Sequence, residues 1–157
     1  MSDCHIKLIK THPDAIIPTK AHEGDNCFDL YAVEETVIHS CSHITVGNDN
    51  RAAIGTAVVP VGLKVGHITP GFGFAIRGRS GLGFKHGIQP HCGEIDNGYR
   101  GDLGIKLYNF TDKRYVVEKG ERIAQIKIER IWDTEIIETE EQVESDRGES
   151  GFGSSGK

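Results

Sequence analysis

The sequence predicts an all-β domain, and three features support this class. Short apolar runs with many β-branched residues recur along the chain, separated by turn-forming Gly, Pro, Asn and Asp. The 20 glycines are consistent with many tight corners. A chain of 157 residues suits a single domain with one core. Many short strands bury their apolar faces best in a sandwich or a closed barrel.

Eight segments have the length and composition of strands. We expect them at residues 6–9, 28–33, 36–38, 57–61, 73–76, 104–109, 115–118 and 123–131. Residues 102–109 alternate polar and apolar side chains, which is the period of a strand with one buried face. A short helix is expected only within residues 82–88. Residues 41–55 are interpreted as an exposed excursion to which no chemistry is assigned.

Charge and cysteine spacing exclude several classes of function. The formal net charge of −5 gives no electrostatic footprint for DNA or RNA, so a polyanionic ligand needs a local cluster of cations or main-chain amides. Cys4, Cys27, Cys41 and Cys92 are too widely spread for a CxxC zinc pair and are interpreted as free thiols. Neither a signal peptide nor a membrane span is apparent. We expect a soluble, intracellular, cytoplasmic protein that binds neither nucleic acid directly nor a membrane.

The C-terminal end differs in composition from the rest of the chain. Glu dominates residues 134–149, and residues 148–157 are almost entirely Gly and Ser. We expect one domain over residues 1–141 and a flexible C-terminal arm over residues 142–157. GxGxxG and GxxxxGK spacings occur in this arm, but no helix follows to hold a phosphate at its N-terminus. Phe152 has no core to join in such an arm and is suited to stacking on a base.

Residues 78–82 combine side chains that suit phosphate binding. Arg79 supplies a planar fork and Ser80 a hydroxyl for phosphate oxygens, while Gly81 allows the main chain to approach closely. Taken alone, the segment favours an exposed turn that carries a surface arginine over a phosphate site.

Residues 93–102 combine a turn signal with an acid and an aromatic side chain. Asn97 and Gly98 predict a tight hairpin that places residues 95–96 opposite residues 99–100. Asp96 and Tyr99 then lie close to one turn. Taken alone, Asp96 could instead bond the main chain of the turn and Tyr99 could pack across the strands.

Five segments in order resemble the five motifs of trimeric dUTPases. They are residues 27–32, 78–82, 93–109, 120–125 and 147–156, so the resemblance covers nearly the whole chain. It implies a jelly-roll-like, distorted β-barrel that forms a homotrimer, with active sites shared between chains and closed by the arm of one. It also implies hydrolysis of dUTP to dUMP and pyrophosphate, which limits uracil incorporation into DNA and supplies dUMP for dTMP synthesis.

The third motif of the resemblance implies the base and sugar contacts. Asp96 corresponds to the carboxylate that activates the water attacking the α-phosphorus, and Tyr99 to the ring that excludes a ribose 2′-hydroxyl. The main chain at Gly93, Ile95 and Gly104 is implied to bind the uracil edge, which leaves polar groups unpaired when cytosine enters.

The first, second and fourth motifs imply the phosphate side of the site. Arg79, Ser80 and Gly81 correspond to phosphate contacts from a neighbouring chain, and Gln125 lies on the side of the phosphates and the water. Asp29 is implied to contact the metal through water. The metal, Mg²⁺, is implied to be held mainly by triphosphate oxygens, in keeping with a sequence that has no clustered acidic ligand set.

The fifth motif implies that the arm closes over the nucleotide. Phe152 corresponds to the ring that caps the uracil, and Arg147, Ser154 and Ser155 to the contacts that hold the γ-phosphate. Gly153 is also implied to bind the substrate. On this interpretation, the arm orders when substrate binds.

Several residues depart from the family pattern. Ser150 and Ser155 stand where Gly and Thr are usual, and Glu94 occupies a usually apolar place. The excursion at residues 41–55 is longer than is usual, and an additional protein partner for it is left open. Two alternatives remain. A dCTP deaminase shares the fold but needs a glutamate where this chain has Lys106, and a non-catalytic nucleotide sensor would bind dUTP without hydrolysis.

Overall fold

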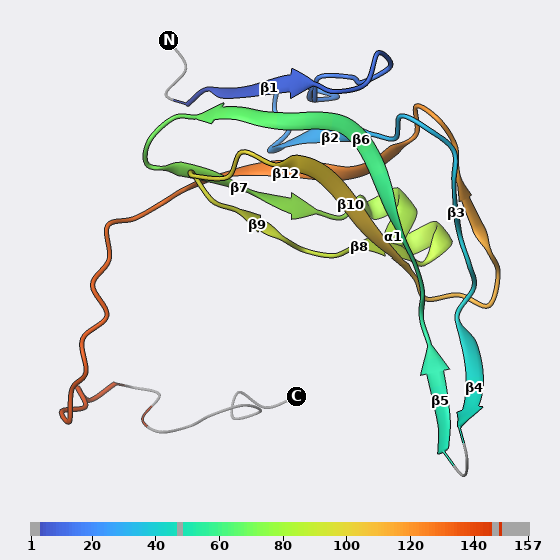
Figure 1. Ribbon diagram of the computed structural model, residues 1–157. Coiled ribbons are helices and arrows are strands. Elements are labelled where there is room, and N and C mark those ends of the chain that lie inside the picture. The colour runs from blue at the N-terminus through green and yellow to red at the C-terminus, as the bar shows by residue number, and fades with distance from the viewer. Residues whose placement is uncertain (1–3, 47–48, 146–147, 149–157) are drawn as a thin grey trace.

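The computed structural model describes residues 4–46, 49–145 and 148, and two four-stranded sheets form most of it (Figure 1). The first sheet has the order β1, β6, β10, β8, with bounds Ile6–Lys10, Gly55–Ile68, Asp102–Asn109 and Ile88–Pro90. The second has the order β2, β12, β7, β9, with bounds Cys27–Tyr31, Arg122–Arg130, Phe72–Arg77 and Glu94–Ile95. All described pairings are antiparallel.

Two small sheets and one helix complete the described structure. The small sheets pair β3 with β11 and β4 with β5, and their bounds are Thr36–Ile38, Tyr115–Val117, Ser42–Val46 and Asp49–Ala53. The helix α1 spans Ser80–His86. Successive strands such as β6 and β7 lie in opposite sheets, as in a jelly-roll. The predicted all-β, jelly-roll-like class is confirmed, although no described pairing closes the two large sheets into one barrel.

Apolar side chains from both large sheets form a single core. In β10, Leu103, Ile105 and Leu107 are buried, so the predicted alternation is confirmed. Phe74 of β7 and Ile126 of β12 belong to the same cluster. Burying a side chain of this size contributes about 1.5–3 kcal/mol. The core therefore fixes the sheet edges from which the polar residues of the site project.

The eight expected strands are present, but β6 is much longer than residues 57–61. It has 14 residues and continues through Pro60 and Gly62, of which Gly62 has a φ of +62°. These two residues are usual signals for the end of a strand. In this chain Pro60 and Gly62 mark an irregularity inside β6 and not its end, because buried side chains occur in β6 both before Pro60 and after Gly62.

The helix and the strand after it differ from expectation. The helix ends at His86 because Gly87 adopts a left-handed conformation, with a φ of +63°, and its N–H bonds back to the helix. The expected helix over residues 82–88 is therefore wrong at its C-terminal end. Ile88 instead begins β8 and pairs with Asn109 of β10.

The expected irregular excursion at residues 41–55 is a β-hairpin. β4 and β5 pair from Ser42 opposite Ala53 to Val46 opposite Asp49, and they project away from the large sheets (Figure 1). The sequence contained only half of a signal for this hairpin: β4 carries Ile, Thr and Val and is followed by a Gly-Asn pair, whereas β5 (DNRAA) has no β-branched or aromatic residue.

The hairpin expected at Asn97 and Gly98 is wrong. The main-chain N–H of Tyr99 donates to the main-chain oxygen of Asp96 at 3.0 Å, which closes a turn. However, β9 pairs with β7 and not with residues 99–100. A two-residue hairpin of the expected type needs positive φ at both central residues. Neither residue has a positive φ. The amide of Asn97 is instead bonded to the connection between β6 and β7.

The chain leaves the second sheet after Arg130 and runs away from it (Figure 1). Residues 131–145 contain neither helix nor strand, and Ile136 is 95% exposed. The boundary of the arm at residue 142 stays a prediction. No helix within the described residues is long and apolar enough to span a bilayer.

Candidate functional site

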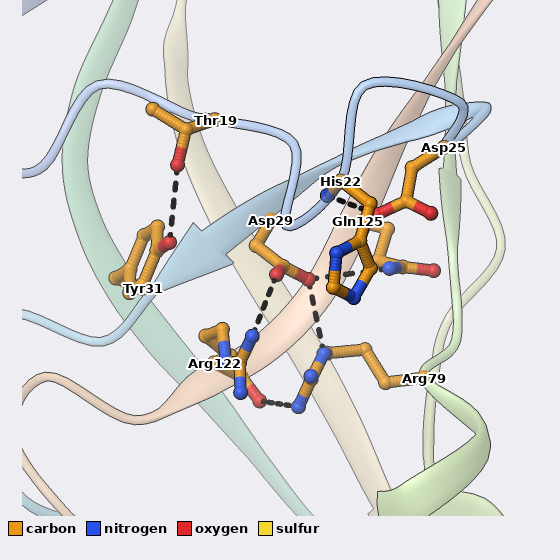
Figure 2. Close-up of polar contacts among 8 residues, drawn as sticks. All are labelled: Thr19, His22, Asp25, Asp29, Tyr31, Arg79, Arg122 and Gln125. Atoms are coloured by element: carbon orange, nitrogen blue, oxygen red, sulfur yellow. Dashed lines mark hydrogen bonds and ion pairs between the residues drawn. The ribbon is translucent and has the colours of Figure 1, made fainter.

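A buried carboxylate, Asp29, gathers three polar side chains, one from the beginning of α1 and two from β12. Asp29 lies in β2 opposite Gln125 of β12, and its side chain is 4% exposed. Figure 2 shows Arg79, Arg122 and Gln125 converging on it. Arg79 Nε donates to Asp29 Oδ1 at 3.0 Å and Gln125 Nε2 to the same oxygen at 3.2 Å. Arg122 Nη1 donates to Asp29 Oδ2 at 3.3 Å.

Arg79 is held in a defined orientation at the beginning of α1. Its Nη1 donates to the main-chain oxygen of Arg122 at 3.0 Å, in addition to the Nε contact with Asp29. Ser80 and Gly81 follow in the first turn of α1 and are exposed. The structure therefore brings Arg79, Gln125 and Asp29 together, with Ser80 and Gly81 beside them.

Arg122 was not among the predicted site residues, although it lies in the fourth motif segment, residues 120–125, where only Gln125 was given a role. Strict alternation along β12 would put Arg122 and Gln125 on opposite faces. The register with β2 shifts between Arg122 and Ala124, which inserts an extra residue. Two consecutive buried residues, Ile123 and Ala124, are the only trace of this bulge in the local pattern. Both polar side chains consequently reach Asp29.

The turn before Arg122 is fixed by the neighbouring glutamate. Glu121 accepts a hydrogen bond from the Tyr115 hydroxyl, and its Oε2 accepts one from the N–H of Glu118 at 3.0 Å. Burial, followed by the hydrogen bond to Glu121, raises the pKa of Tyr115 well above its usual range. Gly120 completes the turn with a φ of +82°. The carboxylate of Glu121 is thus engaged with the turn.

Asp96 lies in a turn that a neighbouring side chain anchors to the sheet. Asn97 Nδ2 lies 2.8 Å from Thr69 O, 2.9 Å from Phe72 O and 3.2 Å from Ile68 O. Asp96 itself is exposed. Its carboxylate is therefore held at the surface by contacts of the next residue.

Tyr99 lies against the main chain beyond the turn. Its hydroxyl donates to the main-chain oxygen of Asp102 at 2.7 Å. A Cβ added at Gly101 would lie 2.4 Å from the Tyr99 hydroxyl oxygen. Because that distance is far below any van der Waals contact, the observed position of the ring requires glycine at 101.

The main chain expected to bind uracil lies in or beside the edge strand β9 and in β10. The N–H of His91, two residues before Gly93, donates to the main-chain oxygen of Lys106 at 2.7 Å. Among the described pairings, β9 pairs only with β7, through Glu94 and Ile95. The Gly93 oxygen accepts from Ile76. A surface cavity of about 380 Å³ extends along Gly104, although neither Gly93 nor Ile95 lines it.

The two groups of predicted residues make no direct polar contact with each other within the part of the chain that the structure describes. No described hydrogen bond or ion pair joins Asp96 or Tyr99 to Asp29, Arg79 or Gln125. The residues predicted to lie in the arm fall outside the described residues: Arg147, Phe152, Gly153, Ser154 and Ser155.

Among the described residues, Asp29 fits an indirect contact with a metal ion, made through a water molecule. Within the described residues there is no group of three or more His, Cys, Asp or Glu side chains that could hold a metal. Asp29 Oδ2 accepts one described hydrogen bond, so this carboxylate oxygen retains capacity for a metal-bound water. Asp29 therefore suits an indirect contact.

Comparisons with known proteins identify the family of the chain. The dUTPase family profile matches residues 13–156. The chain belongs to the dUTPase family. A deoxyuridine 5'-triphosphate nucleotidohydrolase of Helicobacter pylori (strain J99 / ATCC 700824) is 38% identical over 155 residues, or 96% of each protein. The Clostridium novyi (strain NT) dUTPase is 42% identical over 149 residues, which cover 94% of this chain and 95% of the relative.

Solved dUTPase structures share the fold. The Staphylococcus bacteriophage 80alpha dUTPase with dUPNHPP is 28% identical, with a TM-score of 0.79 over 98% of this chain and 99% of the phage protein. A mutant dUTPase from phage phi11 of S. aureus, described with a structural Mg(II) ion, is 22% identical and has a TM-score of 0.71 over 88% of this chain and 98% of the phage protein. This second likeness concerns the dUTPase fold alone.

Proposed function

We propose that the chain hydrolyses dUTP to dUMP and pyrophosphate in the cytoplasm, limiting uracil incorporation into DNA and supplying dUMP for dTMP synthesis. Membership of the dUTPase family carries this proposal. The cluster on Asp29 supports it, because guanidinium and amide groups are suitable donors for phosphate oxygens. Arg79, Ser80, Gly81 and Gln125 bind the phosphates in this proposal.

Asp96 is the general base of the proposed reaction. Its exposed carboxylate takes a proton from a water as the water oxygen attacks the α-phosphorus, and pyrophosphate leaves in line. Asn97 holds the turn, which limits the freedom of the base. Positioning of this kind is a large part of catalysis in phosphoryl transfer.

Tyr99 and nearby main-chain groups select the nucleoside. The hydroxyl of Tyr99 donates to the main-chain oxygen of Asp102, which holds the ring in place. In this position the ring sterically excludes a ribose 2′-hydroxyl. Main-chain groups at Gly93, Ile95 and Gly104 bind the uracil edge. Cytosine would leave these groups unpaired, which is a strong basis for rejection.

We propose that the complete site forms in a homotrimer. Asp96 is not among the described polar contacts of the Asp29 cluster, which supports a site that combines residues of different chains. The arm then closes the site, with Phe152 on the uracil and with Arg147, Gly153, Ser154 and Ser155 on the γ-phosphate.

We propose that Mg²⁺ is the cofactor and that Asp29 contacts it through water. The ion would be held mainly by the triphosphate, where it neutralises charge on the phosphate oxygens. Asp29 also orients the side chains of Arg79 and Gln125, because both donate hydrogen bonds to its Oδ1.

Pyrophosphate release from dUTP in the presence of Mg²⁺ tests the proposal. Asp96→Asn should lose activity by about 10²-fold or more, the contribution typical of a general base. Asp112→Asn, a matched change at another exposed aspartate, should retain activity. If the wild-type trimer binds dUTP but releases no pyrophosphate, the chain is a nucleotide sensor and the enzyme proposal is wrong. Ammonia release from dCTP would favour a deaminase instead.

The arm is tested separately. Deletion of residues 147–157 should lower turnover sharply and leave the mass of the trimer unchanged except for the missing residues. Unchanged turnover in the truncated protein would contradict the role proposed for Arg147 and Phe152.

A further inference from the structure

Two guanidinium groups share the single buried carboxylate of Asp29. Arg79 lies 3.0 Å from Asp29 Oδ1 and Arg122 lies 3.3 Å from Asp29 Oδ2. One negative charge and two positive charges leave a net charge of +1 on the cluster. Neither arginine has another carboxylate as an ion-pair partner within the described residues.

The nearest acid in sequence does not neutralise this surplus. The carboxylate of Glu121 accepts hydrogen bonds from Tyr115 and from the main chain of Glu118. It is therefore committed to the turn that precedes β12. The surplus positive charge remains at the N-terminal end of β12, where the side chain of Arg122 is 46% exposed to solvent.

Arg79 has donors left over for an anion. A guanidinium has five N–H groups. One at Nε is directed to Asp29 and one at Nη1 to the Arg122 oxygen. Three remain beyond these described contacts, on a side chain that is 23% exposed. Without Arg122, however, Arg79 and Asp29 would form a neutral pair with little net attraction for a phosphate.

We infer that Arg122 is a positioning residue for triphosphate binding. It compensates the charge of Asp29 and, through its main-chain oxygen, fixes the guanidinium of Arg79, so that Arg79 keeps a full positive charge for the substrate. This inference rests on the proposed function, because it assumes that Arg79 binds the phosphates.

The inference predicts a charge effect on binding and little effect on the chemical step. Arg122→Gln keeps a donor for Asp29 but removes the positive charge. KM for dUTP and Kd for inorganic pyrophosphate should each rise by about tenfold, while kcat should change by less than about threefold. Arg122→Lys keeps the charge and should restore both constants to within about threefold of the wild type.

Ionic strength distinguishes this role from a structural one. The wild type and Arg122→Gln should differ by about tenfold in Kd for pyrophosphate at about 0.05 M salt and by only about twofold at about 0.5 M, because salt screens partly exposed charges. Arg130→Gln removes an arginine from the other end of β12 and should leave Kd unchanged. A melting temperature should be measured for each variant.

The pyrophosphate titration needs no catalysis, so it separates this inference from the proposed function. If Kd in Arg122→Gln equals that of the wild type, or if the loss is equal in Arg122→Lys and independent of salt, the inference is wrong. If pyrophosphate binding behaves as described but dUTP is not hydrolysed, the charge role stands and the proposed activity is wrong.

Discussion

Asn97 provides the sharpest test of how the structure positions the proposed base. Its amide nitrogen approaches three main-chain oxygens, those of Ile68, Thr69 and Phe72, at 2.8–3.2 Å. An amide has only two N–H groups, so these contacts amount to two hydrogen bonds, one of them shared. Asn97→Ala removes both and leaves half-buried carbonyl groups without that partner.

The expected cost follows from this count. At about 1 kcal/mol for each hydrogen bond, Asn97→Ala should destabilise the fold by about 2 kcal/mol. For a chain of this size, that corresponds to a fall of about 4–8 °C in melting temperature. Because the same contacts hold Asp96, kcat for dUTP should fall by about tenfold, with KM affected less.

Thermal unfolding by circular dichroism and pyrophosphate release measure the two effects. Asn97→Asp is an informative companion, because it directs a carboxylate at three carbonyl oxygens and should be more damaging than alanine. A melting temperature within about 1 °C of the wild type, together with an unchanged kcat, would refute the idea that Asn97 anchors the turn.

Two further predictions concern sugar selection and alkaline stability. Gly101→Ala should displace Tyr99 and lower the preference for dUTP over UTP by about tenfold. Gly98→Ala, where an added Cβ meets nothing within 4 Å, should leave this preference unchanged. An equal ratio of kcat/KM for dUTP to kcat/KM for UTP in the two variants would contradict this. The pKa of Tyr115 is raised by burial and by Glu121, so the folded state keeps a proton that the unfolded state loses above a pH of about 10. That part of the stability is present below this pH and is lost as pH rises further. Tyr115→Phe should therefore show a shallower loss of unfolding free energy in alkaline denaturation, and an identical slope would be evidence against it.

The sequence predicted those features that depend on local pattern. Alternation and β-branched composition located eight strands, and the ordered motifs led to Asp29, Arg79 and Gln125, which the structure brings together. The assignments of Asp96 and Tyr99 stay predictions, although both lie near one turn as expected.

The errors arose where distant contacts decide local structure. Asn97 and Gly98 have the composition of a hairpin, but three carbonyl groups from the β6–β7 connection bind the Asn97 amide and favour another turn. Arg122 lies in the fourth motif segment but was given no role, and alternation alone could not have linked it to Asp29, because a β-bulge changes the face on which it lies. The end of β6 was misjudged because Gly62 adopts a positive φ inside the strand.

The shared carboxylate constrains how this site can evolve. Asp29 of β2 receives donors from two stretches of chain that are far from it in sequence, Arg79 before α1 and Arg122 with Gln125 in β12, so a change at one of them alters the setting of the others. Contacting residues of this kind have non-additive mutational effects. Loss of Asp29 alone would leave Arg79 and Arg122 facing each other with like charges. Sequence drift at these positions should consequently occur as linked replacements, and recombination between distant relatives should be tolerated poorly when it separates β2 from β12.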